Sequence, residues 1–146
     1  MISKASHSFS CLCLIIMLLS LTSCRSDEQN EFFCLHKTID KIQDMYSSKL
    51  YWHKQETDKN IFYSIQMKNK DIAFCFEKQS MVCTSIRVTI DYESKKKYAD
   101  SYVKSLDKEW KKENYTTWYD DYNNKMILLR IDNNDNLYHF YFSNYE

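Results

Sequence analysis

The chain contains neither glycine nor proline in its 146 residues. Phosphate-cradling loops, dinucleotide fingerprints and the sharp turn that presents a nucleophilic serine all use glycine, because the backbone must approach a ligand closely or adopt a positive φ. The sequence therefore argues against these nucleotide-binding and hydrolase classes. Turns must rely instead on Asn and Asp, which tolerate left-handed backbone better than other residues. Such residues cluster at 58–60, 68–71, 123–124 and 133–136.

The first 23 residues have the three-part pattern of a secretory signal peptide. One cation, Lys4, precedes an apolar run at 11–21, and small residues follow that run. A helix of this length rises about 16 Å, which is roughly half of the hydrocarbon core of a bilayer. The run is therefore too short to span a membrane, and we expect residues 1–23 to be removed.

The apolar run ends in Leu21-Thr22-Ser23-Cys24, a branched apolar residue, two small residues and a cysteine. This motif resembles the lipobox of bacterial lipoproteins. The resemblance implies a diacylglyceryl group on the Cys24 thiol and cleavage between Ser23 and Cys24. Several acyl chains on one residue hold a protein at a membrane durably. The alternative is an ordinary signal peptide with a chance cysteine after the cut.

Residues 24–30 form a polar segment between the lipidation site and the first apolar residues. Arg25 stands where similar lipoproteins carry the Asp that retains them in the inner membrane, so the resemblance favours the outer membrane. Asp27 and Glu28 resemble a signal for export to the cell surface, although a plain solvated tether explains them equally well. We therefore expect a cell-envelope protein at the periplasmic face or the cell surface.

The mature chain is near electrical neutrality. Only Lys4 among the 20 Lys and Arg residues lies in the signal peptide, which leaves 19 basic groups against 20 acidic ones. Nucleic-acid binding needs a large basic excess, so no nucleic-acid partner is expected. The remaining length suits one domain, at 31–146.

Hydrophobic periodicity predicts an α+β domain in which two amphipathic helices cover antiparallel sheet(s) of about six to seven strands. The helices are expected at 31–49 and 93–112, with Asp91 as the N-cap of the second and Asn114 as its left-handed end. The apolar stripe of the second helix ends at Trp110, which we expect to be covered by the sheet. The strands are expected at 61–68, 71–77, 81–91, 115–120, 125–132 and 136–143, with a short further one at 50–53.

The two halves of the domain echo each other. Residues 61–76 align without gaps with residues 127–142, at an offset of 66, and each segment follows a helix and a tryptophan-bearing stretch. A duplicated helix-plus-meander unit would explain the echo. Chance would explain it too, because any two aromatic strands with period-2 patterning align well.

Three cysteines remain besides Cys24. If Phe76 and Val82 face the core, Cys75 and Cys83 both point to the other face and lie opposite each other across a three-residue loop. That spacing is close to what a disulfide needs, and secretion would place the pair in an oxidising compartment. The alternative is a reduced pair. If the disulfide forms, Cys34 would be the odd thiol and could pair with another chain.

No pattern of residues indicates catalysis, a metal or a cofactor. The histidines at 36, 53 and 139 lack the spacing of metal-ligand pairs, and no Cys-x-x-Cys motif occurs. No local signature supports a Cys–His hydrolase. We therefore expect no catalytic residues, no metal and no cofactor.

The best candidate for a binding surface is an aromatic stretch that also carries carboxylates. Its aromatic members are Tyr115, Trp118, Tyr119 and Tyr122. The alternative is that these residues are ordinary strand formers. The favoured hypothesis is a non-catalytic module that binds a protein partner, either an envelope component or a toxin neutralised by an immunity-type lipoprotein. Glycan binding through Trp118 and its tyrosines is the second hypothesis, and an unrecognised enzyme is the third.

Overall fold

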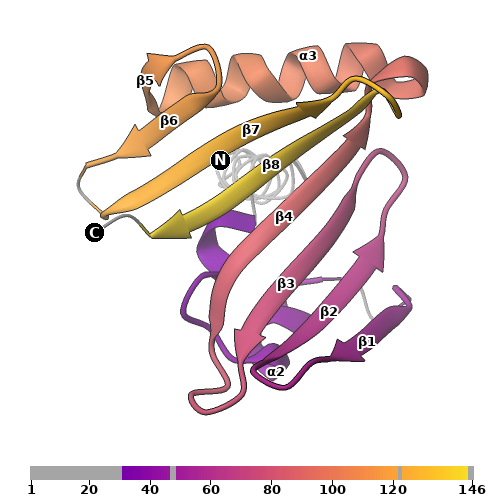
Figure 1. Cartoon of the computed structure of the whole chain (residues 1–146), viewed down its shortest axis with the longest axis vertical. Coiled ribbons are helices and arrows are strands. Elements are labelled where there is room, and N and C mark those ends of the chain that lie inside the picture. The colour runs from indigo at the N-terminus through magenta and orange to yellow at the C-terminus, as the bar shows by residue number, and fades with distance from the viewer. Residues whose placement is uncertain (1–30, 47–48, 122, 145–146) are drawn as a thin grey trace, which may run out of the picture.

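Eight antiparallel strands form one sheet in the computed structural model, which describes residues 31–46, 49–121 and 123–144 (Figure 1). The order across the sheet is β1-β2-β3-β4-β8-β7-β6-β5. The strands are β1 (Trp52–Glu56), β2 (Asn60–Gln66), β3 (Asp71–Glu77), β4 (Cys83–Asp91), β5 (Lys111–Asn114), β6 (Thr117–Asp120), β7 (Lys125–Asp132) and β8 (Leu137–Asn144). The α+β class is confirmed, with one strand more than the sequence predicted.

The sheet consists of two four-stranded meanders that meet where β4 pairs with β8 (Figure 1). Within each half, the strands therefore follow one another in chain order from the edge of the sheet to its centre. The hairpins also share one register, since Ile61 lies opposite Phe76 in β2–β3 and Ile127 lies opposite Phe142 in β7–β8. The offset of 66 therefore matches the second and third strands of the first meander with the third and fourth strands of the second. The echo in the sequence is thus one strand out of step with the repeat of the two meanders.

The helices pack against one face of this sheet. On the β1–β4 half, the ring of Tyr46 lies 5.8 Å from that of Phe74, and on the other half Tyr102 lies 4.8 Å from Phe140. The longest helix is α3 (Tyr92–Glu109), which packs against β4 and β8. The Asp91 side chain accepts a hydrogen bond from the Ser94 amide at 3.2 Å, which confirms the predicted N-cap.

The predicted first helix is wrong, because the segment is broken into a 3-10 turn, η1 (Glu31–Cys34), and a five-residue helix, α2 (Ile39–Gln43). His36 has φ 64° and interrupts the helical path. Its amide donates to the Cys83 carbonyl at 2.8 Å, and the Cys83 amide donates to the Lys37 carbonyl at 2.9 Å. Backbone pairing with the start of β4 has therefore replaced the helical turn. The apolar stripe is kept, since Leu35 and Ile42 are buried.

The end of the second helix also differs from the prediction. The chain becomes extended at Trp110, and residues 111–114 form β5, which was expected to be helix. Lys111 and Lys112 pair with Tyr119 and Trp118 of β6, so these backbone groups bond within the sheet. Asn114 is a strand residue rather than a left-handed helix end. Its side chain accepts from the Thr116 amide at 2.9 Å and shapes the following turn.

Positive-φ positions replace the missing glycines at four described residues. Asn124 and Asn136 have φ of 50° and 53°, in two of the Asn-rich turns expected from the sequence. Met81, at φ 55°, and His36 were not anticipated.

Candidate functional site

The face of the sheet opposite the helices is a broad surface that the fold leaves exposed. We call it the open face, and no described helix packs on it. Alternation along the strands places there Phe62, Ser64, Ala73, Cys75, Ser85, Arg87, Met126, Leu128, His139 and Tyr141, all of which are half-buried or exposed. Their neighbours along each strand point into the core. The same period-2 pattern that builds the core therefore also builds this second surface.

One row of cross-strand neighbours crosses the centre of the open face. The register places the following residues side by side from β1 to β7: His53, Ser64, Ala73, Arg87, Tyr141 and Leu128. This row contains a cation, an aromatic ring and an aliphatic side chain, and it carries no carboxylate. The acidic residues of β3, β4 and β7 lie at strand ends.

A hollow interrupts this row in the β1–β4 half. Ser64 and Ala73 lie opposite each other, and their small side chains leave a depression between the larger ones of His53 and Arg87. The hollow has a volume of about 470 Å³ and adjoins a second of about 340 Å³ that shares these four residues. A side chain from a partner can enter such a depression, but its breadth and openness do not resemble an enclosed catalytic pocket.

The hollow presents the guanidinium of Arg87 and the imidazoles of His53 and His139. Burial lowers the pKa of His139, and the nearby Arg87 guanidinium lowers it further, so the ring is neutral at neutral pH. The Nδ1 atom of His139 lies 3.0 Å from the hydroxyl of Thr89. Burial also raises the pKa of Asp71 at the rim. The Arg87 guanidinium offers a donor fork suited to a carboxylate.

The aromatic stretch chosen from the sequence does not form one surface. Tyr115 is 91% exposed in the turn after β5, whereas the Trp118 side chain is fully buried. Tyr119 is half-buried on the open face, and Tyr122 lies outside the described residues. The prediction that Trp118 belongs to a binding surface is wrong. Tyr119 pairs with Met126 beside the central row, so among the three described members it is the one that lies on the open face.

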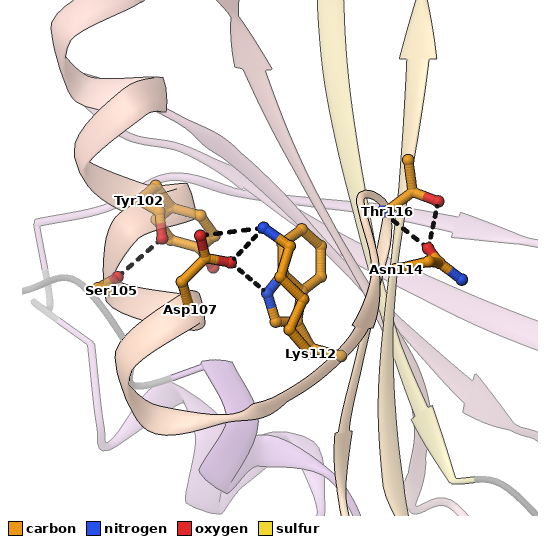
Figure 2. Close-up of polar contacts among 7 residues, drawn as sticks. Tyr102, Ser105, Asp107, Lys112, Asn114 and Thr116 are labelled. Atoms are coloured by element: carbon orange, nitrogen blue, oxygen red, sulfur yellow. Dashed lines mark hydrogen bonds and ion pairs between the residues drawn. The ribbon is translucent and has the colours of Figure 1, made fainter.

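Contacts with Asp107 and Lys112, both labelled in Figure 2, hold Trp118 inward. Its Nε1 donates to a carboxylate oxygen of Asp107 on α3 at 2.8 Å, and Lys112 forms an ion pair with the same carboxylate at 2.8 Å. The Lys112 ammonium also lies 5.5 Å from the centre of the indole ring. Partial burial by itself would raise the pKa of Asp107, but the hydrogen bonds from Lys112 and Trp118 outweigh it and lower the pKa. The cluster fastens β6 to α3 and leaves no indole face for a ligand.

Trp110 departs from its predicted place as well. It was expected beneath α3, but it lies just beyond the helix end and is only half-buried. Its ring meets that of Phe32 edge-on at 4.9 Å. Trp110, which was expected in the core, is therefore the more exposed of the two tryptophans, and Trp118, a candidate for the binding surface, is the buried one.

The predicted Cys75–Cys83 disulfide does not fit the register. A bulge between Cys75 and Phe76 places Cys75 opposite Ser85 and Cys83 opposite Phe76. Cys83 therefore faces the core and Cys75 the open face, and neither they nor Cys34 are disulfide-bonded. Burial raises the pKa of the Cys34 and Cys83 thiols to about 12, so neither is an activated nucleophile.

One ion pair of the described chain is buried in its interior. Glu31 and Lys70 form an ion pair 2.5 Å long, with side chains only 1% and 2% exposed. The Lys70 ammonium also lies 5.6 Å from the centre of the Tyr102 ring. A pair closed off in this way cannot reach a substrate, and it fixes the start of the domain to the β2–β3 turn.

The described residues contain neither a metal-binding cluster nor a helix that could span a membrane. No group of three or more His, Cys, Asp or Glu side chains is placed to hold a metal ion there. Within the same residues, none of the helices is both long and apolar enough to cross a bilayer. Cys24 lies outside the described residues.

The chain matches no protein-family model, no curated protein and no solved structure. Its function therefore has to be inferred from its own residues.

Proposed function

We propose that the chain is a bacterial lipoprotein of the cell envelope that binds a protein partner through the open face of its sheet. The observation that carries this proposal is the open face itself, on which Arg87 borders the hollow and Tyr141, Met126 and Leu128 lie on the neighbouring strands β8 and β7. Aromatic residues, Met and Arg are enriched in protein interfaces, and carboxylates are depleted from their centres. The central row has both properties.

The dimensions of the open face suit such an interface. Eight strands spaced about 4.8 Å apart, with about seven residues at 3.3 Å each, cover roughly 800 Å². One partner of a standard protein complex buries about 800 Å². The open face is therefore large enough to serve alone.

The chemistry of the hollow indicates what the partner contributes. Arg87 stands in the centre of the sheet with the neutral His139 beside it. A partner carboxylate that entered the hollow would form charge-assisted hydrogen bonds with the guanidinium. We therefore infer an acidic residue at the centre of the partner's surface, whether that partner is an envelope component or a toxin.

The glycan-binding alternative has lost its main support. A sugar-binding site needs an exposed aromatic platform, and the indole of Trp118 is buried against Asp107. We do not propose it.

The open face can be tested in cells with a photo-crosslinking side chain. Leu128→benzoylphenylalanine should give a discrete crosslinked species, and Arg87→Glu in the same chain should abolish it. Lys104, exposed on α3, supplies the matched controls: benzoylphenylalanine there should give no such species, and Lys104→Glu should leave the Leu128 crosslink intact. Equal crosslinking from both positions, or insensitivity to Arg87→Glu, would refute the proposed interface.

The anchor is tested separately. Cys24→Ser should leave the chain unlipidated, uncut or miscut, and it should no longer enter the detergent phase with lipidated proteins. A variant that still matures and stays with the membrane would contradict the lipobox assignment.

A further inference from the structure

Three aromatic side chains form an exposed patch where the described chain begins. The patch consists of Phe32, Phe33 and Trp110, and Phe33 is 54% exposed. The ring of Phe32 meets those of Phe33 and Trp110 edge-on, at 5.3 Å and 4.9 Å. The Lys125 ammonium lies 3.7 Å from the centre of the Phe32 ring. The two phenylalanines come from η1, and the tryptophan comes from the end of α3.

The patch lies beside a small cavity on the helix-covered side of the sheet. Its walls include Tyr102, Leu106 and Phe142, all of which point away from the open face. The volume is about 160 Å³, below the 300–1,000 Å³ typical of small-molecule sites. The cavity therefore does not explain why the aromatic rings are exposed, and a surface contact does.

The patch is also held close to the proposed lipidation site. The buried ion pair with Lys70 fixes Glu31, the residue directly before Phe32. Seven peptide steps separate Cys24 from Glu31, and they reach at most about 25 Å when fully extended. If Cys24 carries the lipid, the patch cannot move farther than that from the bilayer surface.

Charge around the patch is mixed, so the rings dominate its chemistry. Glu109 and Asp120 line the cavity, and Lys125, the cross-strand partner of Asp120, lies near both Asp120 and Lys37. Aromatic rings with a polar neighbour prefer the headgroup region of a membrane, where one end is apolar and the other is wet.

We propose that Phe32, Phe33 and Trp110 insert into the headgroup region of the membrane that holds the lipid on Cys24. This inference rests on the proposed lipid anchor. The contact turns the helix-covered side toward the bilayer and the open face away from it. The lipid keeps the protein at the membrane, and the patch sets the orientation in which the open face meets its partner.

The test uses the purified mature lipoprotein in vesicles of phosphatidylethanolamine and phosphatidylglycerol, with or without bromine on the acyl chains. Bromine quenches tryptophan emission only at short range. One of the three tryptophans lies in the patch, so brominated vesicles should quench roughly a third of the emission. Trp110→Phe should remove most of that quenching. Trp52→Phe, which removes a half-buried tryptophan on β1, is the matched control and should retain it.

A second variant, Phe33→Ser, changes an exposed ring and leaves the core intact. It should float with the vesicles as the wild type does while losing most of the quenching of Trp110. Wild-type protein that floats without being quenched, or a Trp110→Phe variant quenched as strongly as the wild type, would overturn the patch and leave the anchor standing. Wild-type protein that does not float would overturn the anchor, and the patch with it.

Discussion

Replacing Trp118 should cost the fold more than replacing Trp110. Trp118 is fully buried between β6 and α3, and its indole N–H donates a hydrogen bond to Asp107 at 2.8 Å. Truncating a buried tryptophan to alanine costs about 3–5 kcal/mol, from lost transfer free energy and the cavity left behind. The hydrogen bond adds only about 1 kcal/mol, because the Asp107 side chain is 39% exposed and water can replace the donor. Trp118→Ala should therefore remove a large part of a domain stability of about 5–15 kcal/mol.

Trp110 gives the matched comparison, because it has the same chemistry and is half-buried at the surface. Its truncation should cost less than that of Trp118, because part of the ring is already in water. Trp118→Phe separates ring volume from the hydrogen bond and should fall between the two alanine variants.

The free energies of unfolding come from urea melts followed by far-ultraviolet circular dichroism, which does not depend on the tryptophans themselves. A loss at Trp110 that equals or exceeds the loss at Trp118 would refute the reasoning. It would mean that the helix end, rather than the Asp107 cluster, closes this side of the core.

Three further predictions concern the charges and thiols. Because hydrogen bonds lower the pKa of Asp107, its ionised form stabilises the fold above about pH 4, and this contribution is lost as the pH falls through the lowered pKa; the stability gap between wild type and Asp107→Asn, measured by urea melts from pH 7 to pH 3, should therefore narrow. Lys70→Met should cost about 3–5 kcal/mol by leaving the Glu31 carboxylate buried without its cation, whereas Lys70→Met combined with Glu31→Leu should recover most of that loss in the same melts. In native mature protein treated with iodoacetamide, mass spectrometry should find Cys75 labelled first and Cys83 only after unfolding, and early labelling of Cys83 would contradict its buried position.

Periodicity in the sequence predicted the regular strands well. The strands at 71–77 and 125–132 were predicted with the bounds that the structure shows, because their alternation is strong and Asn or Asp turns flank them. The cap at Asp91 was predicted for a similarly local reason, since its partner lies three residues away. Local patterns of this kind need no knowledge of the rest of the fold.

Features set by distant partners could not be predicted in this way. The helical spacing from Phe32 to Tyr46 is real, but backbone pairing with Cys83 breaks the helix at His36. A one-residue bulge turns Cys83 into the core, and no local pattern announces it. Lys111 to Asn114 continue a charged helix in sequence and become a strand only because β6 is there to pair with them.

The candidate site was missed for a similar reason. Arg87, Leu128 and Tyr141 occupy the alternate positions of predicted strands, so the sequence assigns them to the side away from the core. Their importance depends on both helices packing against the same face, which leaves the other one bare. Trp118 was predicted to lie on a binding surface because its neighbours in the sequence are polar. Its orientation is instead set by Asp107 on α3, which accepts a hydrogen bond from the indole.

The meeting of β4 with β8 also has a consequence for how the chain folds. As the exported chain emerges from its N-terminus, the outer edge of β4 has no partner until β8 follows, since Ser85 pairs with Ser143 and Asp91 with Leu137. During that interval the first meander carries an unpaired strand edge, the feature that most readily recruits another chain. Closing so long a loop is slow compared with forming a hairpin. We therefore expect the pairing of β4 with β8, which makes the sheet continuous, to be the last strand pairing to form. Until it forms, the incomplete chain is most exposed to aggregation.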